Sequence, residues 1–176
     1  MSNPLLDFSA LPAFDRITPA DVAPAIDTLL ARADAALETV TAPGFPADWT
    51  AIARVLDVAT EELGRAWGVV SHLNSVADTP ELREAYNSNL AKLSEFYTEL
   101  GQNLALFAKV KALAASADYA GLSAARRQII EHQLRDFRLS GAELPDAEKT
   151  RFAEIQARLS ELSARFSQNV LDATDG

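Results

Sequence analysis

The segment RLSELSARFSQNVLDATDG, residues 158–176, has the residue spacing that decides the fold. Its large apolar residues Leu159, Leu162, Phe166 and Val170 recur at steps of three and four, which places them on one face of an α-helix. The same spacing continues backwards to Phe152. The segment therefore predicts a long amphipathic helix over about 145–171 whose apolar stripe needs a partner.

The polar side of this predicted helix carries charges of both signs. Glu154 precedes Arg158 by four residues, and Glu161 precedes Arg165 by four. Such i,i+4 pairs with the acid first stabilise a helix by a few tenths of a kcal/mol. We expect both pairs to form.

Four further segments upstream show the same helical period. Each begins at a capping residue, in two cases followed by proline in the first turn, and the predicted helices cover 18–42, 48–78, 79–116 and 123–140. No segment alternates as a strand does, and no long repeat occurs. The sequence predicts an all-α fold, an antiparallel bundle of about five helices over 18–176. Residues 1–17 lack a period and are expected to form an extended arm across the bundle.

Four glycines carry specific structural expectations. Gly64 and Gly68 lie one helical turn apart, a spacing that favours close approach of a neighbouring helix. Gly101 is a weak point within the predicted helix 79–116. Gly141 follows Ser140, where glycine can adopt the left-handed conformation that ends a helix.

Composition and charge exclude several classes of function. The chain of 176 residues has no cysteine, so disulfides, thiolate nucleophiles and cysteine-bound metals are excluded. The net charge of -9 disfavours nucleic acid as a partner. No apolar run is long enough to cross a membrane, and the N-terminal sequence does not resemble a signal peptide. A cytoplasmic location is expected.

Residues that could carry chemistry do not form a recognisable motif. Serine-hydrolase and phosphate-binding motifs are missing, and His72 and His132 are too far apart in sequence for the usual zinc-binding pair. A metal site would need these histidines to meet in space with a carboxylate such as Glu131. Acidic pairs such as Glu61 and Glu62 have the spacing of solvated helix faces. We therefore predict no catalytic, cofactor-binding or metal-binding residues in this chain.

Four stretches, in order and with similar gaps, resemble the N-terminal region of the thimet oligopeptidase family of zinc peptidases. They are NPLLDFSALPAFDRITPADVAPAI (3–26), GVVSHLNSVADTPELREAYNSNLAKLSEFYTELGQN (68–103), LRDFRLSGAELP (134–145) and RLSELSARFSQNVLDAT (158–174). Together the resemblance runs from Asn3 to Gly176. The segment Ser71–Ser75 within it is typical of the family, but no role can be assigned to it.

The resemblance implies a helical, clam-like enzyme with a neurolysin-like fold and a deep channel, which cleaves short peptides at a zinc ion. The His-Glu-x-x-His motif and the further glutamate that hold this zinc have no counterpart here, so the isolated chain is expected to be inactive. The resemblance also implies that the chain continues beyond Gly176 into the remainder of the peptidase, its expected partner. The helices over 48–78 and 79–116 would form part of one channel wall.

Two hypotheses of function follow. In the first, the chain is the channel-wall portion of a cytoplasmic zinc oligopeptidase and has no chemistry of its own. It predicts a substantial apolar patch where the missing part would dock. In the second, the chain is a stand-alone helical bundle that binds partner helices through the stripe from Phe152 to Val170. A bundle with its own metal site, held by His72 and His132, is a third and more remote alternative.

Overall fold

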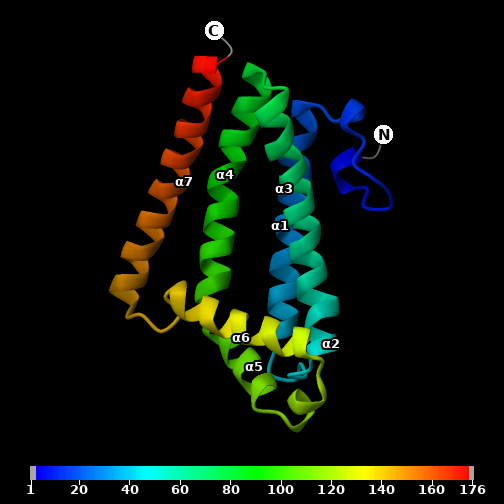
Figure 1. Cartoon of the computed structure of the whole chain (residues 1–176), viewed down its shortest axis with the longest axis vertical. Helices are drawn as coiled ribbons and strands as arrows, with labels where there is room; N and C mark the ends of the chain where they lie inside the picture. The colour runs from blue at the N-terminus through cyan, green and yellow to red at the C-terminus, as the bar shows by residue number, and fades with distance from the viewer. Residues whose placement is uncertain (1–2, 175–176) are drawn as a thin grey trace.

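A computed structural model describes residues 3–174, and these residues are helical throughout apart from turns and connections. The α-helices are α1 (Pro19–Thr41), α2 (Trp49–Ile52), α3 (Val58–Val76), α4 (Pro80–Gln102), α5 (Leu104–Ala114), α6 (Ala124–Leu139) and α7 (Asp146–Thr174). A π-helical turn, Ala53–Asp57, joins α2 to α3. The all-α prediction is confirmed (Figure 1).

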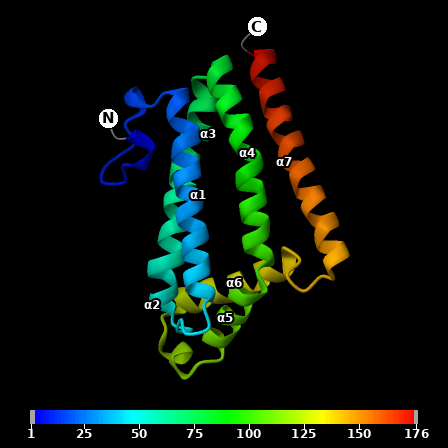
Figure 2. The same ribbon diagram turned by 180° about the vertical axis from the view of Figure 1, so that it is seen from behind.

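The long helices α1, α3, α4 and α7 alternate in direction in chain order, so α1 and α4, which also pack on each other, run parallel. The helices α5 and α6 lie across one end (Figures 1 and 2). The predicted helical bundle is present, but one helix departs from the predicted antiparallel arrangement. The helix predicted over 123–140 forms as α6, but it closes the end of the bundle and does not run alongside the others. It packs mainly against α5.

Local capping chemistry fixes where the helices begin. The Asp21 carboxylate accepts hydrogen bonds from the backbone N–H and the hydroxyl of Thr18, at 2.9 and 2.6 Å, ahead of α1. The Thr79 hydroxyl accepts from the N–H of Leu82 at the start of α4. These bonds engage polar groups that would otherwise lack partners at a helix end, so the starts could be predicted from sequence.

The single helix predicted over 79–116 is in fact two. The chain leaves helical geometry at Asn103, whose side-chain oxygen accepts a hydrogen bond of 2.8 Å from the N–H of Leu106 and so caps α5. Asparagine competes well for backbone groups in this way. Nearby, a Cβ on Gly101 would lie 2.8 Å from Ser140 Cβ and Oγ, so glycine permits close approach of α4 to the end of α6.

Gly141 ends α6 as predicted, with a φ of +82°. Its N–H bonds to the carbonyl of Arg138, and the N–H of Ala142 bonds to the carbonyl of Phe137 at 2.9 Å, the paired arrangement of a Schellman motif. The expectation for Gly64 and Gly68 is wrong. A Cβ on Gly68 would meet no atom within 4 Å, and one on Gly64 would meet only the Tyr97 hydroxyl at 3.9 Å.

Two apolar clusters form the core. The first lies between α1, α3 and α4, and the second lies between the end of α1, α2, the π turn, α5 and α6. The N-terminal arm contributes buried Leu5 to the first cluster, and Phe8 and Ile17 pack at its edge. The arm contains two short 3-10 turns, Pro4–Leu6 and Phe14–Arg16. In contrast, α7 contributes no buried residue to either cluster.

Candidate functional site

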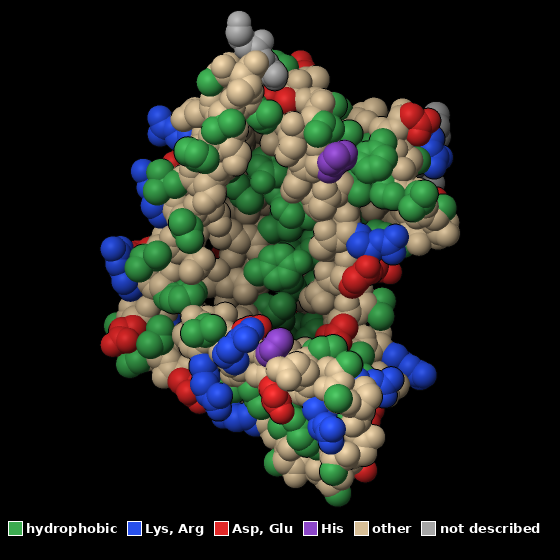
Figure 3. All heavy atoms as spheres, viewed as in Figure 1, with side chains coloured by type: hydrophobic (Ala, Val, Ile, Leu, Met, Phe, Trp, Pro, Cys, Tyr) green, Lys and Arg blue, Asp and Glu red, His purple; other side chains and the backbone are tan. Residues whose placement is uncertain are grey.

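A hollow opens on one face of the molecule between α3, α4 and α7, with the end of α6 as its floor (Figure 3). We call this hollow the central groove. It consists of two adjoining cavities of about 580 and 430 Å³ that share Leu90 and Ser160. The residues that define it are Trp67, Ser71, Asn74, Ser75, Tyr86, Leu90, Leu93, Ser94, Tyr97, Thr98, Asp136, Leu139, Ser140, Phe152, Gln156, Leu159, Ser160, Ser163, Ala164, Ser167 and Leu171.

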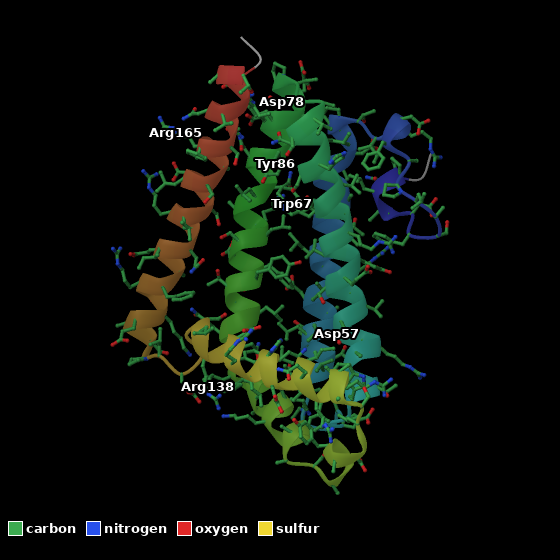
Figure 4. The ribbon with its side chains drawn as sticks, viewed as in Figure 1. Asp57, Trp67, Asp78, Tyr86, Arg138 and Arg165 are labelled. Carbon is green, nitrogen blue, oxygen red and sulfur yellow. The ribbon has the colours of Figure 1, made fainter. Side chains whose placement is uncertain are left out.

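Aromatic side chains form much of the apolar wall. Trp67 of α3 and Tyr86 of α4 stack with their ring centroids 4.7 Å apart, and both lie between the two helices (Figure 4). Tyr97, further along α4, is 41% exposed. Helical spacing predicts core positions for these tyrosines. Phe96 is buried as expected, whereas Tyr97 faces the groove.

Polar side chains of α3 and α7 line the other part of the groove. Ser71, Asn74 and Ser75 come from the segment to which the sequence assigns no role, and Ser163 and Ser167 face them from α7. The Asn74 side chain is 7% exposed, and its amide oxygen has no hydrogen-bond partner among the described residues. A neutral lining of hydroxyl and amide groups suits main-chain amides better than ions. Sequence analysis missed this cluster because its members come from two distant helices.

Two groups near the base of the groove have altered acidities. Burial raises the pKa of the Asp57 carboxyl, which lies at the π turn (Figure 4). Desolvation likewise raises the pKa of the Tyr97 phenol. Both residues, with Thr60, line a smaller hollow beneath the groove. Asp57 therefore keeps its proton to a higher pH than an ordinary aspartate.

The outer wall of the groove, α7, packs on α4 through small and polar residues. Ser160 Oγ lies 3.1 Å from Ser94 Oγ, and Gln168 donates a hydrogen bond of 2.8 Å to Asn87. The residues of α7 that are partly covered recur at steps of four or three: Lys149, Phe152, Gln156, Ser160, Ala164, Gln168 and Leu171. The predicted apolar stripe lies on an adjacent face and, apart from Phe152, stays exposed.

The predicted ion pairs of α7 are also wrong in register. Arg151 pairs with Glu154 at 2.9 Å and Arg158 pairs with Glu161 at 2.6 Å, both at i,i+3 with the base first. Each arginine pairs with a glutamate one turn towards the C-terminus. The sequence predicted instead that each arginine would pair with a glutamate one turn towards the N-terminus. All four side chains are more than half exposed, so these pairs contribute little to stability.

A charged cluster fastens the far end of α7. Arg83 of α4 donates to both carboxylate oxygens of Asp172, at 3.1 and 2.6 Å, and also to Asp78 just before α4. The hydrogen bond from Arg83 lowers the pKa of Asp172, and bonds to both carboxylates raise the pKa of Arg83. This is the one link that joins the α3–α4 turn to α7 through charge among the described residues.

The two histidines do not share neighbours. His72 meets the ring of Phe14 in the arm, with centroids 5.6 Å apart, and His132 of α6 bonds to Gln128 at 2.8 Å. Within residues 3–174, no group of three or more His, Asp or Glu side chains is arranged to hold a metal ion. The donor set described does not fit a zinc site. None of the described helices has the length and apolarity that a membrane span requires.

Fold and site together define an all-helical protein that presents a concave, partly aromatic groove, and among residues 3–174 no group of three or more His, Asp or Glu side chains is arranged to hold a metal ion. Residues 26–149 match the family described as the N-terminal domain of neurolysin/thimet oligopeptidase. The chain belongs to this family.

Curated relatives extend the match to the full chain. Oligopeptidase A of Salmonella typhimurium is 45% identical over 176 residues, which is all of this chain and 26% of that protein. Oligopeptidase A of Haemophilus influenzae is 45% identical over 177 residues, again covering all of this chain and 26% of the relative. A probable cytosolic oligopeptidase A of Arabidopsis thaliana is 37% identical over 173 residues, which is 98% of this chain and 24% of that protein. The chain thus spans about a quarter of the length of these relatives.

Proposed function

We propose that this chain is the N-terminal helical portion of a cytoplasmic zinc oligopeptidase and that its central groove forms part of the wall of the substrate channel. The observation that carries the proposal is the match of the whole chain, at 45% identity, to a quarter of oligopeptidase A. The cytoplasmic location follows the name of the Arabidopsis relative, which describes that protein as cytosolic.

The groove has the chemistry that a wall for short peptides requires. Trp67, Tyr86 and Leu139 supply apolar contacts, while Asn74 and the serines around it supply neutral hydrogen-bonding groups. Peptides of varied sequence share their main-chain amides and differ in their side chains. A surface of this mixed, mostly uncharged kind, with Asp136 as the one acidic residue among those that define the groove, therefore favours binding without strong sequence preference.

The bond-breaking chemistry is assigned to polypeptide outside this chain. The zinc ion and its ligands would belong to the remainder of the peptidase, because the described residues here offer no suitable set of donors. In this proposal the chain binds and orients peptide substrate but exchanges no proton with it. Its contribution would affect substrate affinity and length preference more than the chemical step.

The experiment replaces the aligned quarter of Salmonella oligopeptidase A with residues 1–176 and measures hydrolysis of a series of short peptides. Leu139 is 70% exposed and lines the groove, whereas Leu104 is 55% exposed and lies outside it. Leu139→Ala should lower kcat/KM by about two- to tenfold, mainly through KM, since one apolar contact is lost. Leu104→Ala is the matched control and should leave kcat/KM unchanged. Equal values for both variants would contradict the channel-wall role.

The alternative of a stand-alone interaction module rests on the exposed stripe of α7. A native protein of 19.0 kDa detected in cells by an antibody to this segment would support the alternative. A native protein several times larger would support the peptidase. The full-length match to a quarter of longer relatives favours the peptidase.

A further inference from the structure

We propose that the exposed apolar stripe of α7 is the surface on which the remaining polypeptide of the peptidase packs, beside the groove that contacts substrate and sharing only Leu159 with it. We define the stripe as Ile155, Leu159, Leu162, Phe166 and Val170. The inference rests on the proposed function, since it takes the remainder of the peptidase as the occupant. The inference goes beyond the proposed function because it names the surface of this chain that the remainder covers.

The stripe is exposed along more than half of α7, which has 29 residues. The exposed fractions are 48% for Ile155, 54% for Leu159, 44% for Leu162, 70% for Phe166 and 47% for Val170. These positions span 16 residues, or about 22 Å of helix at 1.5 Å per residue. Apolar side chains of α7 and of the groove lie on the same face of the molecule (Figure 3). Continuous apolar surface of this kind marks an interaction site more often than free surface.

The helix α7 already packs on α4 within this chain, and it does so through a face that does not include the stripe. Its partly covered face meets α4 through the Ser94–Ser160 contact and the Asn87–Gln168 hydrogen bond, and Arg83 holds its end. A helix docked by small and polar residues, with its large apolar residues left open, is arranged for a second partner on the adjacent face. That arrangement is the reverse of an ordinary surface helix.

The remainder of the peptidase is the occupant that the observations favour. The curated relatives are about four times as long as the matched region, so a large polypeptide must pack against this portion in such enzymes. Because that polypeptide is covalently joined, its effective concentration at the stripe is high. A second copy of the chain is disfavoured, since two chains of net charge -9 repel each other.

The test compares the same substitutions in the isolated chain and in the chimera with the remainder of Salmonella oligopeptidase A. Phe166→Glu adds one negative charge to the stripe. Arg165→Gln changes the charge equally, at the neighbouring residue, which lines the opposite groove between α4 and α7 and forms no ion pair among residues 3–174. Thermal unfolding and limited proteolysis of the segment 146–174 are measured for each protein.

In the isolated chain, both variants should unfold at the temperature of the wild type, because Phe166 is mostly exposed there. In the chimera, Phe166→Glu should lower Tm by several degrees and speed cleavage within 146–174, and Arg165→Gln should do neither. Equal stability of the two chimeras would overturn the proposal. So would a wild-type chimera in which residues 1–176 unfold independently of the rest.

Two other outcomes distinguish this proposal from a dimer of the chain and from the channel-wall function. If the isolated chain sediments as a dimer that Phe166→Glu converts to monomer, the occupant is a second copy and the proposal fails. If Phe166→Glu destabilises the chimera while Leu139→Ala leaves peptide hydrolysis unchanged, the stripe is supported as the packing surface and the channel-wall function fails. The stability measurement and the kinetic measurement therefore test different claims.

Discussion

Glycine has opposite effects at two positions of this fold, and the difference comes from what surrounds each Cα. Gly68 lies within α3, and a side chain there would meet open space. Gly101 lies near the end of α4, where an added methyl group would lie 2.8 Å from Ser140 Cβ and Oγ. Glycine within a helix costs about 0.5–1 kcal/mol relative to alanine unless a close contact requires it.

Gly68→Ala should therefore raise the free energy of unfolding by about 0.5–1 kcal/mol, which corresponds to about 1–4 °C in Tm. Gly101→Ala should lower it by about 1–3 kcal/mol, because the new methyl group displaces Ser140. Thermal denaturation followed by circular dichroism measures both. Adding Ser140→Gly to Gly101→Ala should recover part of the loss, since the contacting atoms belong to that side chain. A double variant no more stable than Gly101→Ala alone would contradict this cause.

The roles of residues whose hydrogen bonds are local in sequence were predictable from the sequence. Thr18, Thr79 and Gly141 end or begin helices through bonds within a few residues, and the structure confirms these roles. The expected contact at Gly64 and Gly68 depended on which helix would lie beside them. That information is absent from local spacing, and the structure leaves open space beside Gly68 and only the Tyr97 hydroxyl, at 3.9 Å, beside Gly64.

At the scale of elements, the period of a helix predicts its faces but not the partner of each face. The stripe on α7 was correctly identified as apolar, yet the helix docks by the adjacent ridge that contains Ser160 and Ala164. The break at Asn103 illustrates a second limit. Apolar spacing continues through this residue, and only the capping bond to Leu106 reveals that one predicted helix is two.

The attachment of α7 should depend on Arg83 and on pH. Arg83→Gln removes the charged link to Asp172, so amide hydrogen exchange in the last turns of α7 should become several-fold faster. The lowered pKa of Asp172 means that the link stabilises the folded state above about pH 3.8, the ordinary value, and is lost as pH falls through the lower folded pKa. In Arg83→Gln the link is already absent, so lowering the pH should not further weaken the attachment of the last turns of α7. Amide hydrogen exchange measured by mass spectrometry, relative to the intrinsic exchange rate at each pH, tests this.

A matched control is available on the same helix. Lys92 pairs with Asp27 of α1 at 2.6 Å, and its side chain is 43% exposed, compared with 29% for Arg83. Lys92→Gln removes one cation from α4 without touching α7. It should leave exchange in α7 at the wild-type rate at every pH. Equal acceleration by Lys92→Gln and Arg83→Gln would show that net charge, and not the Arg83–Asp172 link, holds α7.

At the scale of the whole molecule, the sequence predicted the helical class and the family resemblance but not the groove. Ser71 and Asn74 are separated from Ser163 and Ser167 by about ninety residues, and only the docking of α7 on α4 brings them to one hollow. Trp67 and Tyr86 have the spacing of core residues, which is partly correct because they also pack at the edge of the first apolar cluster. A surface assembled from three helices leaves no compact motif in the sequence.

The isolated chain should bind no stoichiometric zinc and should not cleave short peptides. Zinc requires about three protein ligands at a catalytic site, and His72 and His132 have separate surroundings, an aromatic contact with Phe14 and a hydrogen bond with Gln128. After incubation with zinc and removal of free ion, elemental analysis should find far less than one zinc per chain. His72→Ala is the informative comparison. If wild type retained one zinc that His72→Ala lost, the chain would possess its own metal site and the scaffold interpretation would be wrong. Peptide hydrolysis by the purified chain, undiminished by further purification, would contradict it independently, because it would place the reacting groups within these 176 residues.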